Sequence, residues 1–366
     1  MLADASSFSG AFSGKKVWLS GVSGFKGSWL AEWLLSLGAD VRGFSLPPPT
    51  SPSLFEQAGI AARIAWDCKD LRDAAAVKTS LLAAQPDFVF HLAAQPLVRL
   101  SYKEPVGTWE TNVMGTINVL EALRASAGPC AAVFVTTDKC YENREWLHGY
   151  REEDALGGYD PYSSSKAACE IAIGSWRRSF FKDHPVQIVS ARAGNVIGGG
   201  DWAADRIVPD CIRALQKGGT VEVRNKSATR PWQHVLEPLC GYLRLAEAAA
   251  NGEIKTQLIS SAASASAFNF GPDLEANRTV QDLVQEILKH MPGTWTDCGD
   301  PSAPHEAGQL NLATEKAFHL LGWRPRWSFE TTVEKTAAWY LRASGCRTAE
   351  EFSRLTQEQI KEYSGE

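Results

Sequence analysis

The sequence predicts an α/β protein built on a doubly wound parallel sheet, with a smaller α+β lobe. Two observations carry this prediction. Short apolar runs alternate with helical segments through the first half of the chain, which is typical of parallel strands joined by crossover helices. A glycine-rich turn, G-V-S-G-F-K-G at 21–27, joins the first apolar run to the first helix. The length of 366 residues allows a large core and two lobes.

The expected elements follow from the pattern of apolar residues and from the Gly and Pro residues that end each run. A helix after the glycine turn ends near Gly38, a plausible C-cap, and the second strand stops at P-P-P. Further helices are expected at about 70–84 and 107–126, and beyond 195 the pattern loosens into short strands at 220–224 and 268–271 and an amphipathic helix at 280–290. The strands expected in the main sheet are 16–20, 40–45, 63–67, 87–94, 131–137 and 187–192.

This pattern divides the chain into three parts. We expect a dinucleotide-binding Rossmann domain over 14–194, to which a segment at about 230–262 returns. Residues 195–229 and 265–345 are expected to form the smaller lobe over the carboxyl ends of the strands, where ligands of open α/β sheets bind. The last part, 346–366, is expected to be a helical tail.

Composition excludes several classes of partner. The net charge is −5 and no basic tract stands out, which argues against nucleic acid and anionic membranes. No apolar run approaches the ~20 residues that span a bilayer. The first residues carry an Asp and lack the features of a signal peptide, so a cytoplasmic location is expected. The eight scattered cysteines form no metal-ligand spacing, and we expect reduced thiols and no metal site.

Gly21, Gly24 and Gly27 indicate a cofactor site. Small residues at this turn let the backbone approach a pyrophosphate at the helix N-terminus, although a purely structural tight turn would use the same triplet. No acidic residue ends the second strand to bind an adenosine ribose, so this position does not separate NAD from NADP. Asp67, which ends the third strand, is expected either to accept a hydrogen bond from adenine or to cap the following helix.

Five side chains able to catalyse chemistry on a sugar alcohol stand within one short span. Thr137, Asp138 and Lys139 follow the fifth strand, Tyr162 comes 23 residues after Lys139, and Lys166 comes four residues after Tyr162. A Tyr and a Lys four residues apart lie on one face of a helix, so both can reach one ligand. Cys140 could supply a thiolate, but no His stands close by in the sequence to activate it.

With these residues in view, the chain resembles the extended short-chain dehydrogenases/reductases. Among these it resembles the nucleotide-sugar 4,6-dehydratases, and most of all the family acting on CDP-glucose. Relatives that act on dTDP-glucose carry T-D-E where this chain has T-D-K, so Lys139 discriminates, whereas Val22 departs from the His common in the CDP-glucose family. The resemblance spans about 14–340 and rests on G-F-K-G-S-W-L (24–30), H-L-A-A-Q-P-L-V-R-L-S-Y (91–102), T-N-V-M-G-T (111–116), T-D-K-C-Y-E-N-R-E-W (137–146), G-G-Y-D-P-Y-S-S-S-K (157–166), R-A-G-N-V-I-G-G-G-D-W (192–202) and R-P-W-Q-H-V-L-E-P (230–238).

The resemblance implies an NAD-dependent conversion of CDP-D-glucose to CDP-4-dehydro-6-deoxy-D-glucose and water. It implies that Tyr162, helped by Lys166, takes the 4-hydroxyl proton, that Thr137 orients that hydroxyl, and that Asp138 is the acid. Lys139 is then either the C5 base, as a neutral amine, or an enolate stabiliser, as an ammonium. Beyond these five catalytic residues, it implies cofactor contacts from Gly21, Gly24, Phe25, Gly27, Asp67, Leu92, Ala93, Ala94, Tyr162 and Lys166, and substrate contacts from Gln95, Asn195, Arg206 and Arg230.

The resemblance also implies a homodimer or homotetramer paired through helices at 107–126 and 162–180, and a role in deoxysugar supply for bacterial surface polysaccharide such as O-antigen lipopolysaccharide. Three alternatives stay open at this point. They are a 4,6-dehydratase of another nucleotide-sugar, a nucleotide-sugar 4-epimerase that shares only the Tyr and Lys, and a non-catalytic NAD-binding module.

Overall fold

The computed structural model describes residues 8, 10–254, 266–299 and 309–365. A seven-stranded parallel sheet forms its centre, in the order β11-β6-β5-β4-β1-β2-β3. This confirms the doubly wound α/β class. The strands are β1 (Lys16–Ser20), β2 (Asp40–Ser45), β3 (Ala65–Cys68), β4 (Phe88–His91), β5 (Cys130–Val135), β6 (Val186–Ala193) and β11 (Ala267–Phe270).

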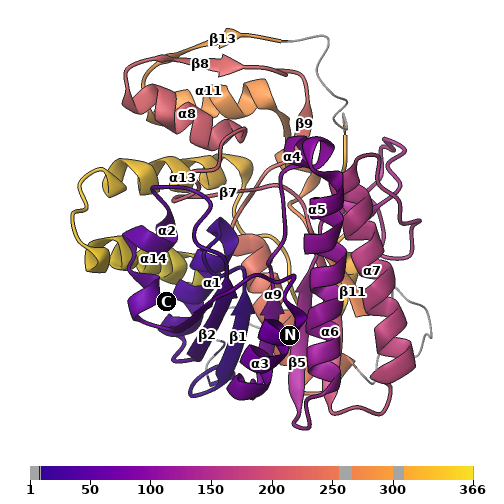
Figure 1. Ribbon diagram of the computed structural model, residues 1–366. Helices are drawn as coiled ribbons and strands as arrows, with labels where there is room; N and C mark the ends of the chain where they lie inside the picture. Colours follow the sequence, from indigo (N-terminus) through magenta and orange to yellow (C-terminus); the bar gives the residue numbers. More distant parts are fainter. Residues whose placement is uncertain (1–7, 9, 255–265, 300–308, 366) are drawn as a thin grey trace.

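Helices cover both faces of the sheet (Figure 1). Alternation along the strands explains this: Val17 and Leu19 join one apolar cluster with α1 and α9, whereas Trp18 joins a second cluster with α3 and α6. The helices around the sheet are α1 (Phe25–Ser36), α2 (Leu54–Gln57), η1 (Ile60–Ala62), α3 (Ala74–Ala84), α4 (Val98–Lys103), α5 (Pro105–Trp109), α6 (Gly115–Arg124), α7 (Pro161–Phe180), α9 (Leu236–Ala250), α12 (Glu315–Leu321), α13 (Phe329–Ala343) and α14 (Ala349–Ser364).

Strand β11 corrects the expected division of the chain. The sequence assigned the segment at 268–271 to the smaller lobe, but β11 pairs in parallel with β6 and completes the main sheet. Its pairing partner is more than 70 residues away in the sequence, so no local pattern marks it as a strand of the main sheet. The smaller lobe contains β7 (Val196–Ile197), α8 (Ile207–Gln216), β8 (Thr220–Val223), β9 (Thr229–Pro231), β10 (Gln233–His234), η5 (Leu274–Ala276), β12 (Asn277–Thr279), α11 (Val280–His290) and β13 (Thr294–Asp297).

The smaller lobe lies above the carboxyl ends of the strands, with α8, α11, β8 and β13 at its top (Figure 1). Its short strands pair as β10-β7, β12-β9 and β13-β8. A capping box between Thr279 and Asp282 fixes the start of α11, and the apolar face of this helix joins the main core. The lobe and the sheet therefore enclose the site described below.

The helical tail packs back onto the first helix of the Rossmann domain. Glu32, in α1, is fully buried and accepts hydrogen bonds from Arg63, from Ser353 at 3.0 Å and from Gln357 at 3.1 Å. Ser353 and Gln357 belong to α14, which lies in the tail that was expected to be helical. A buried carboxylate with several donors thus anchors the tail to the cofactor-binding half.

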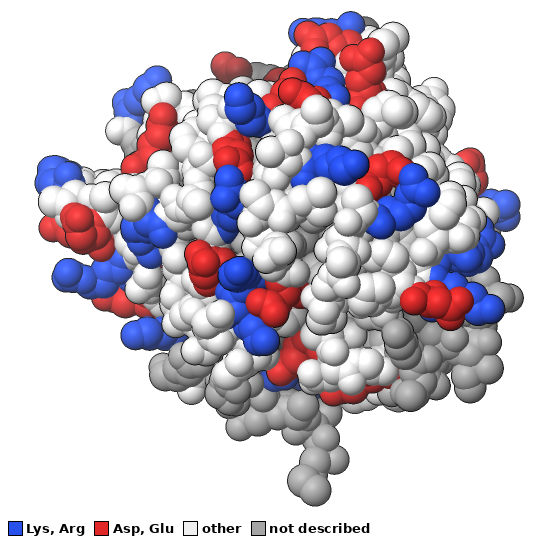
Figure 2. Space-filling view, turned by 60° about the horizontal axis from the view of Figure 1, so that its bottom comes forward, with Lys and Arg blue, Asp and Glu red and all other residues white. Residues whose placement is uncertain are grey.

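On the face seen in Figure 2, acidic and basic side chains are interspersed and form no large patch of one sign. None of the helices described here combines the length and apolar character needed to cross a bilayer.

Candidate active site

A cavity of about 2070 Å³ lies between the carboxyl ends of the strands and the smaller lobe. It is large enough for two extended ligands side by side, since a drug-sized ligand fills ~300–1,000 Å³. The structure brings fifteen of the predicted site residues to its wall, and two others do not line it. Those on the wall are Gly21, Gly24, Phe25, Gly27, Leu92, Ala93, Ala94, Thr137, Asp138, Lys139, Tyr162, Lys166, Asn195, Arg206 and Arg230.

The packing of the glycine turn against neighbouring backbone atoms requires glycine at two positions. Gly21 has a φ of +74°, and a Cβ at this position would lie 2.7 Å from the backbone nitrogen of Ala93. A Cβ at Gly27 would overlap the Gly21 carbonyl. Gly24 caps α1 without a side-chain hydrogen bond, so the first amides of that helix have no side-chain partner at its N-cap and face the cavity. These features fit the diphosphate of a dinucleotide.

Asp67 is not placed for either expected role. Its carboxylate is bound by Arg42, at 2.7 and 3.0 Å, and by Ser80 at 2.5 Å, and it does not line the cavity. The helix that follows is capped by Asp73 instead. Asp70, which was not among the predicted site residues, lines the cavity just past β3. Its position just after a strand could have indicated Asp70 as a site residue. That prediction would have needed the end of β3 to within three residues.

The Gln95 side chain also forms hydrogen bonds within the protein and does not line the cavity. Its side chain donates to Thr108 at 2.9 Å and accepts from the Leu97 amide at 2.6 Å. Its backbone is held by Asn112, whose side chain accepts from the Gln95 amide at 2.8 Å and donates to Ser165 at 2.9 Å. Gln95 therefore shapes the loop after β4, and its side chain is not a substrate ligand in this structure.

Asn112 lies in η2 (Glu110–Met114), a π-helical turn between α5 and α6. The extra residue of such a turn turns a side chain inward, and π-helical turns are frequent at functional sites. Here Asn112 ties the loop after β4 to α7, the helix carrying Tyr162. Asn112 was not among the predicted site residues, although its segment, 111–116, carries part of the family resemblance.

Thr137, Asp138 and Lys139 lie in and before η3 (Asp138–Cys140), directly after β5. The Thr137 hydroxyl caps this turn and donates to Asp138 Oδ1 at 3.0 Å. Lys139 Nζ lies 3.1 Å from Asn195 Oδ1 and 3.7 Å from Asp138 Oδ1. Cys140 faces the interior, and burial raises the pKa of its thiol, which opposes a nucleophilic thiolate.

Tyr162 and Lys166 are both buried at the start of α7. Asp160 caps this helix by accepting from the Tyr162 and Ser163 amides at 3.0 Å each, which fixes the first turn. Burial raises the pKa of Tyr162, while the neighbouring Thr137 hydroxyl and the charge of Arg206 act in the opposite direction. Lys166 Nζ donates to the Val135 carbonyl at 3.1 Å, and burial lowers its pKa.

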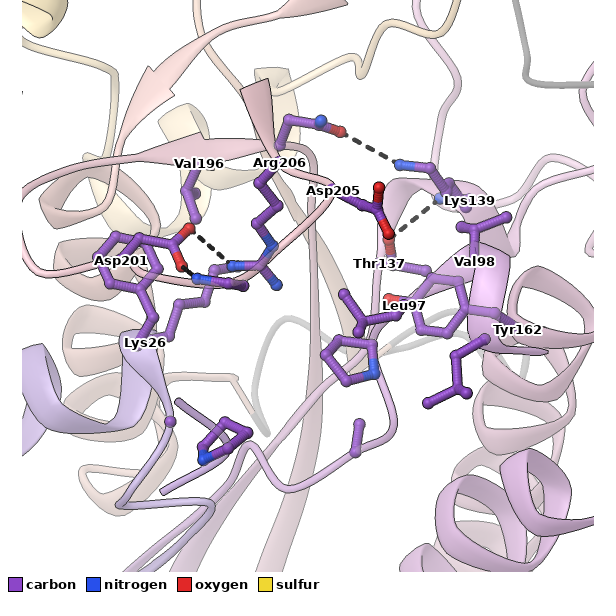
Figure 3. A pocket seen from close by; sticks show the side chains of 18 of the residues that line it. Lys26, Leu97, Val98, Thr137, Lys139, Tyr162, Val196, Asp201, Asp205 and Arg206 are labelled. Atoms are coloured by element: carbon purple, nitrogen blue, oxygen red, sulfur yellow. Dashed lines mark hydrogen bonds and ion pairs between the residues drawn. The ribbon is translucent and has the colours of Figure 1, made fainter. Parts of the chain in front are cut away.

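A second group of charges lies across the cavity from Tyr162. Figure 3 shows Lys26, Asp201 and Arg206 on one side and Thr137, Lys139 and Tyr162 on the other. Arg206 is held by Asp201 at 2.8 Å. Burial and the neighbouring Arg206 lower the pKa of Lys26 to about 7, partly opposed by Asp138. Neither Lys26 nor Asp201 was among the predicted site residues.

Together these features define a class of protein. A glycine turn suited to a dinucleotide opens into a cavity. The wall of the same cavity carries a Tyr and a Lys four residues apart and a buried threonine hydroxyl. Such an arrangement is that of a Rossmann-fold enzyme of the short-chain dehydrogenase/reductase type, working on an alcohol carbon.

Comparisons with known proteins agree with this class. Residues 19–336 match the family described as GDP-mannose 4,6 dehydratase. The chain is 44% identical over 335 residues to a CDP-glucose 4,6-dehydratase of Salmonella typhimurium, covering 89% of this chain and 90% of the relative. It is 30% identical to a dTDP-glucose 4,6-dehydratase of Streptomyces antibioticus, covering 88% and 91%. The chain therefore belongs to the nucleotide-sugar 4,6-dehydratase family.

Solved structures show the same fold at low identity. A UDP-glucose 4-epimerase of Thermotoga maritima with UDP-glucose has a TM-score of 0.75 at 19% identity, covering 90% of this chain and 99% of that one. A dTDP-glucose 4,6-dehydratase of Bacillus anthracis in complex with NAD has a TM-score of 0.70 at 19% identity, covering 89% and 96%.

Proposed function

We propose that the protein converts CDP-D-glucose to CDP-4-dehydro-6-deoxy-D-glucose and water, with NAD as a recycled cofactor. The observation that carries this proposal is the joint placement of Thr137, Asp138, Lys139 and Tyr162 on the wall of the cavity that the glycine turn opens. The relative from Salmonella, named a CDP-glucose 4,6-dehydratase, supports the choice of CDP-glucose.

The first step is a proton transfer at the 4-hydroxyl of the sugar. Tyr162 as phenolate accepts that proton, and Thr137 holds the hydroxyl in place. NAD, when bound, would supply the redox chemistry, by accepting the hydride from C4 and returning it to C6 after water is lost, while a proton returns to C5. The amides of the first turn of α1 and the glycines before it would hold the diphosphate of the cofactor.

The second step is loss of water across C5 and C6. The ketone at C4 acidifies the C5 proton, and the departing 6-hydroxyl needs a proton. Asp138 is the proposed acid, because it is buried on the cavity wall beside Thr137. Asn195, Arg206 and Arg230 line the same cavity and are proposed to bind the nucleotide-sugar; the two arginines supply positive charge for its diphosphate.

Lys139 has two proposed roles, as C5 base or as enolate stabiliser. Its Nζ contacts the Asn195 and Asp138 oxygens, a placement that serves either role. Lys139→Met separates the two. If Lys139 stabilises the enolate, the variant still exchanges the C5 proton with D2O, at a reduced rate. Complete loss of exchange, with hydride transfer from C4 retained, would assign the base to Lys139.

A 4-epimerase is the main alternative, and the fold alone does not separate the two activities. An epimerase needs no acid for a departing hydroxyl, so the Asp138 and Lys139 pair favours dehydration. The complete set of catalytic side chains on one cavity wall also argues against a silent cofactor-binding module.

We also propose that the protein is a homodimer or homotetramer. Exposed apolar side chains lie along α5, η2 and α7, where the family pairing was expected: Val106 is 70% exposed, Met114 50% and Ile171 59%. A cytoplasmic location is proposed on the eight free cysteines, which suit a reducing compartment. Supply of a deoxysugar for bacterial surface polysaccharide is proposed from the family alone.

The experiment that tests the proposed function offers three substrates in parallel. The protein and NAD are incubated with CDP-glucose, dTDP-glucose or GDP-mannose, and the products are weighed by mass spectrometry. Loss of one water from CDP-glucose alone is expected. Water loss only from another nucleotide-sugar would overturn the substrate, and unchanged masses with a new sugar configuration by NMR would indicate an epimerase.

A further inference from the structure

The residues proposed for catalysis come from three elements that meet behind the cavity wall. The turn at 137–139 (the catalytic turn) follows β5, Tyr162 and Lys166 lie on α7, and Asn195, which contacts Lys139, follows β6. Strands β5 and β6 are neighbours in the sheet, and α7 packs against the catalytic turn and against β6. The proposed reaction needs these elements in one fixed arrangement, because proton transfer requires groups within hydrogen-bond reach.

A buried carboxylate joins all three elements. Glu170 lies on α7, eight residues after Tyr162, and is 5% exposed. It accepts hydrogen bonds from Thr136 at 2.5 Å, from Ser190 at 2.9 Å and from Arg192 at 2.8 Å. Thr136 follows β5 directly, and the other two donors belong to β6. Glu170 thus holds the end of β5 and the body of β6 against its own helix.

Glu170 is present as a carboxylate. Burial by itself would raise its pKa, but the charge of Arg192 and the hydrogen bonds that Glu170 receives lower the pKa below its ordinary value. A carboxylate only accepts hydrogen bonds, so the Thr136 hydroxyl is the donor in their contact. Hydrogen bonds to an ionised acceptor are roughly twice as strong as neutral ones. The contact with Glu170 therefore constrains the position of Thr136 strongly.

Two residues of α7 hold two consecutive residues at the end of β5. Lys166 donates to the Val135 carbonyl at 3.1 Å, and Glu170 accepts from Thr136. Residues four apart lie on one helix face, so both contacts come from the face of α7 that also carries Tyr162. The catalytic turn begins at the next residue of the chain. Its placement relative to Tyr162 is therefore set by these two contacts.

We propose that Glu170 is a positioning residue for the dehydration, because its hydrogen bond from Thr136 holds the catalytic turn opposite Tyr162. Glu170 lies behind the cavity wall and does not line the cavity, so it acts through Thr136 and not on a ligand. This inference rests on the proposed dehydration. Loss of the contact is expected to lower kcat, whereas the binding of NAD and of the nucleotide-sugar, which use other parts of the wall, is expected to persist.

The test compares Thr136→Val, which removes the hydroxyl, with Thr136→Ser, which keeps it. Ser190→Ala is the matched control, because Ser190 donates to the same carboxylate from β6, and Arg192 still holds that oxygen in the variant. With NAD and CDP-glucose, kcat is expected to fall at least about tenfold in Thr136→Val and to stay within about threefold of wild type in the other two variants, since a small misplacement of reacting groups can cost ~100-fold. KM for CDP-glucose is expected to change little in all three, and Thr136→Val and Ser190→Ala are expected to lower the urea midpoint to a similar extent.

A double-mutant cycle separates positioning from direct contact with a ligand, because Thr136 also lines the cavity. Glu170→Gln offers its three donors one acceptor oxygen in place of two and is expected to lower kcat by itself. In that background Thr136→Val is expected to lower kcat less than about twofold, because the contact is already lost. A full-size effect of Thr136→Val in the Glu170→Gln background would overturn the proposal.

Equal kcat values for Thr136→Val and Ser190→Ala would also overturn the positioning role, and so would a loss confined to KM. The comparison of these hydroxyl variants decides the question if Glu170→Gln does not fold by circular dichroism. The failure of the proposed function looks different, since wild type would then form no dehydrated product from CDP-glucose, and the positioning role would fall with it.

Discussion

Lys26→Met is predicted to stabilise the protein in a pH-dependent way. Lys26 lies in the first turn of α1, on the cavity wall, with Nζ 3.5 Å from the Tyr242 hydroxyl. Burial, followed by the charge of Arg206, lowers its pKa from 10.5 to about 7, although Asp138 acts in the opposite direction. Methionine has a similar length and carries no charge.

The magnitude follows from the size of this pKa change. A lysine with a lowered pKa in the folded state costs stability in full below pH 7, and the cost disappears as pH rises through the unfolded-state value of 10.5. At about 1.4 kcal/mol per unit, the upper limit is about 5 kcal/mol. The side chain is partly exposed to the cavity, so screening by water reduces the expected gain to about 2–3 kcal/mol.

Urea unfolding of the cofactor-free protein at pH 6 and at pH 9.5 measures this effect. Lys26→Met is expected to exceed wild type most at pH 6, with a smaller difference at pH 9.5. Lys78→Met, at an exposed position in α3, is the control and should show no such trend. Equal differences at the two pH values, or a less stable Lys26→Met at pH 6, would refute the reasoning.

The remaining predictions concern the glycine turn at 21–27 and the contact between Glu32 and the helical tail. Gly27→Ala is expected to lose NAD binding by at least about tenfold in titration calorimetry, because the new Cβ would overlap the Gly21 carbonyl, whereas Gly128→Ala, with nothing within 4 Å, should bind normally. Glu32→Ala is expected to cost about 1–3 kcal/mol in urea unfolding, because it removes the buried carboxylate that accepts from Arg63 and from the α14 donors. Exposed Glu350→Ala should change stability by less than about 0.5 kcal/mol, and a comparable loss there would contradict the role given to Glu32.

The sequence correctly predicted the helices whose ends are set by neighbouring residues. The helix after the glycine turn ends where expected, with Gly38 at φ +79° just past the C-cap. The amphipathic pattern at 280–290 gave α11 with both boundaries, because a capping box defines its start. The candidate segment 137–139 and the Tyr162 end of α7 also lie together on the cavity wall, because both follow β5 at the carboxyl edge of the parallel sheet.

The features that were not predicted depend on contacts between residues far apart in the sequence or on exact element boundaries. Nothing near β11 reveals that its partner is β6, and nothing in the segment around Asn112 shows that one turn widens into a π-helix. Asp67 and Asp70 are only three residues apart, and the exact end of β3 decides which of them reaches the cavity. Gln95 faces inward because Thr108 and Leu97 satisfy its amide, a contact that depends on how α5 packs.

The most direct test of the proposed dehydration follows the hydrogen at C4. CDP-glucose carrying deuterium at C4 is incubated with the protein and NAD, and the product is examined by NMR. An internal redox dehydration predicts loss of one water with the deuterium found at C6 of the same sugar. Deuterium that remains at C4, or is lost to solvent, would contradict the account.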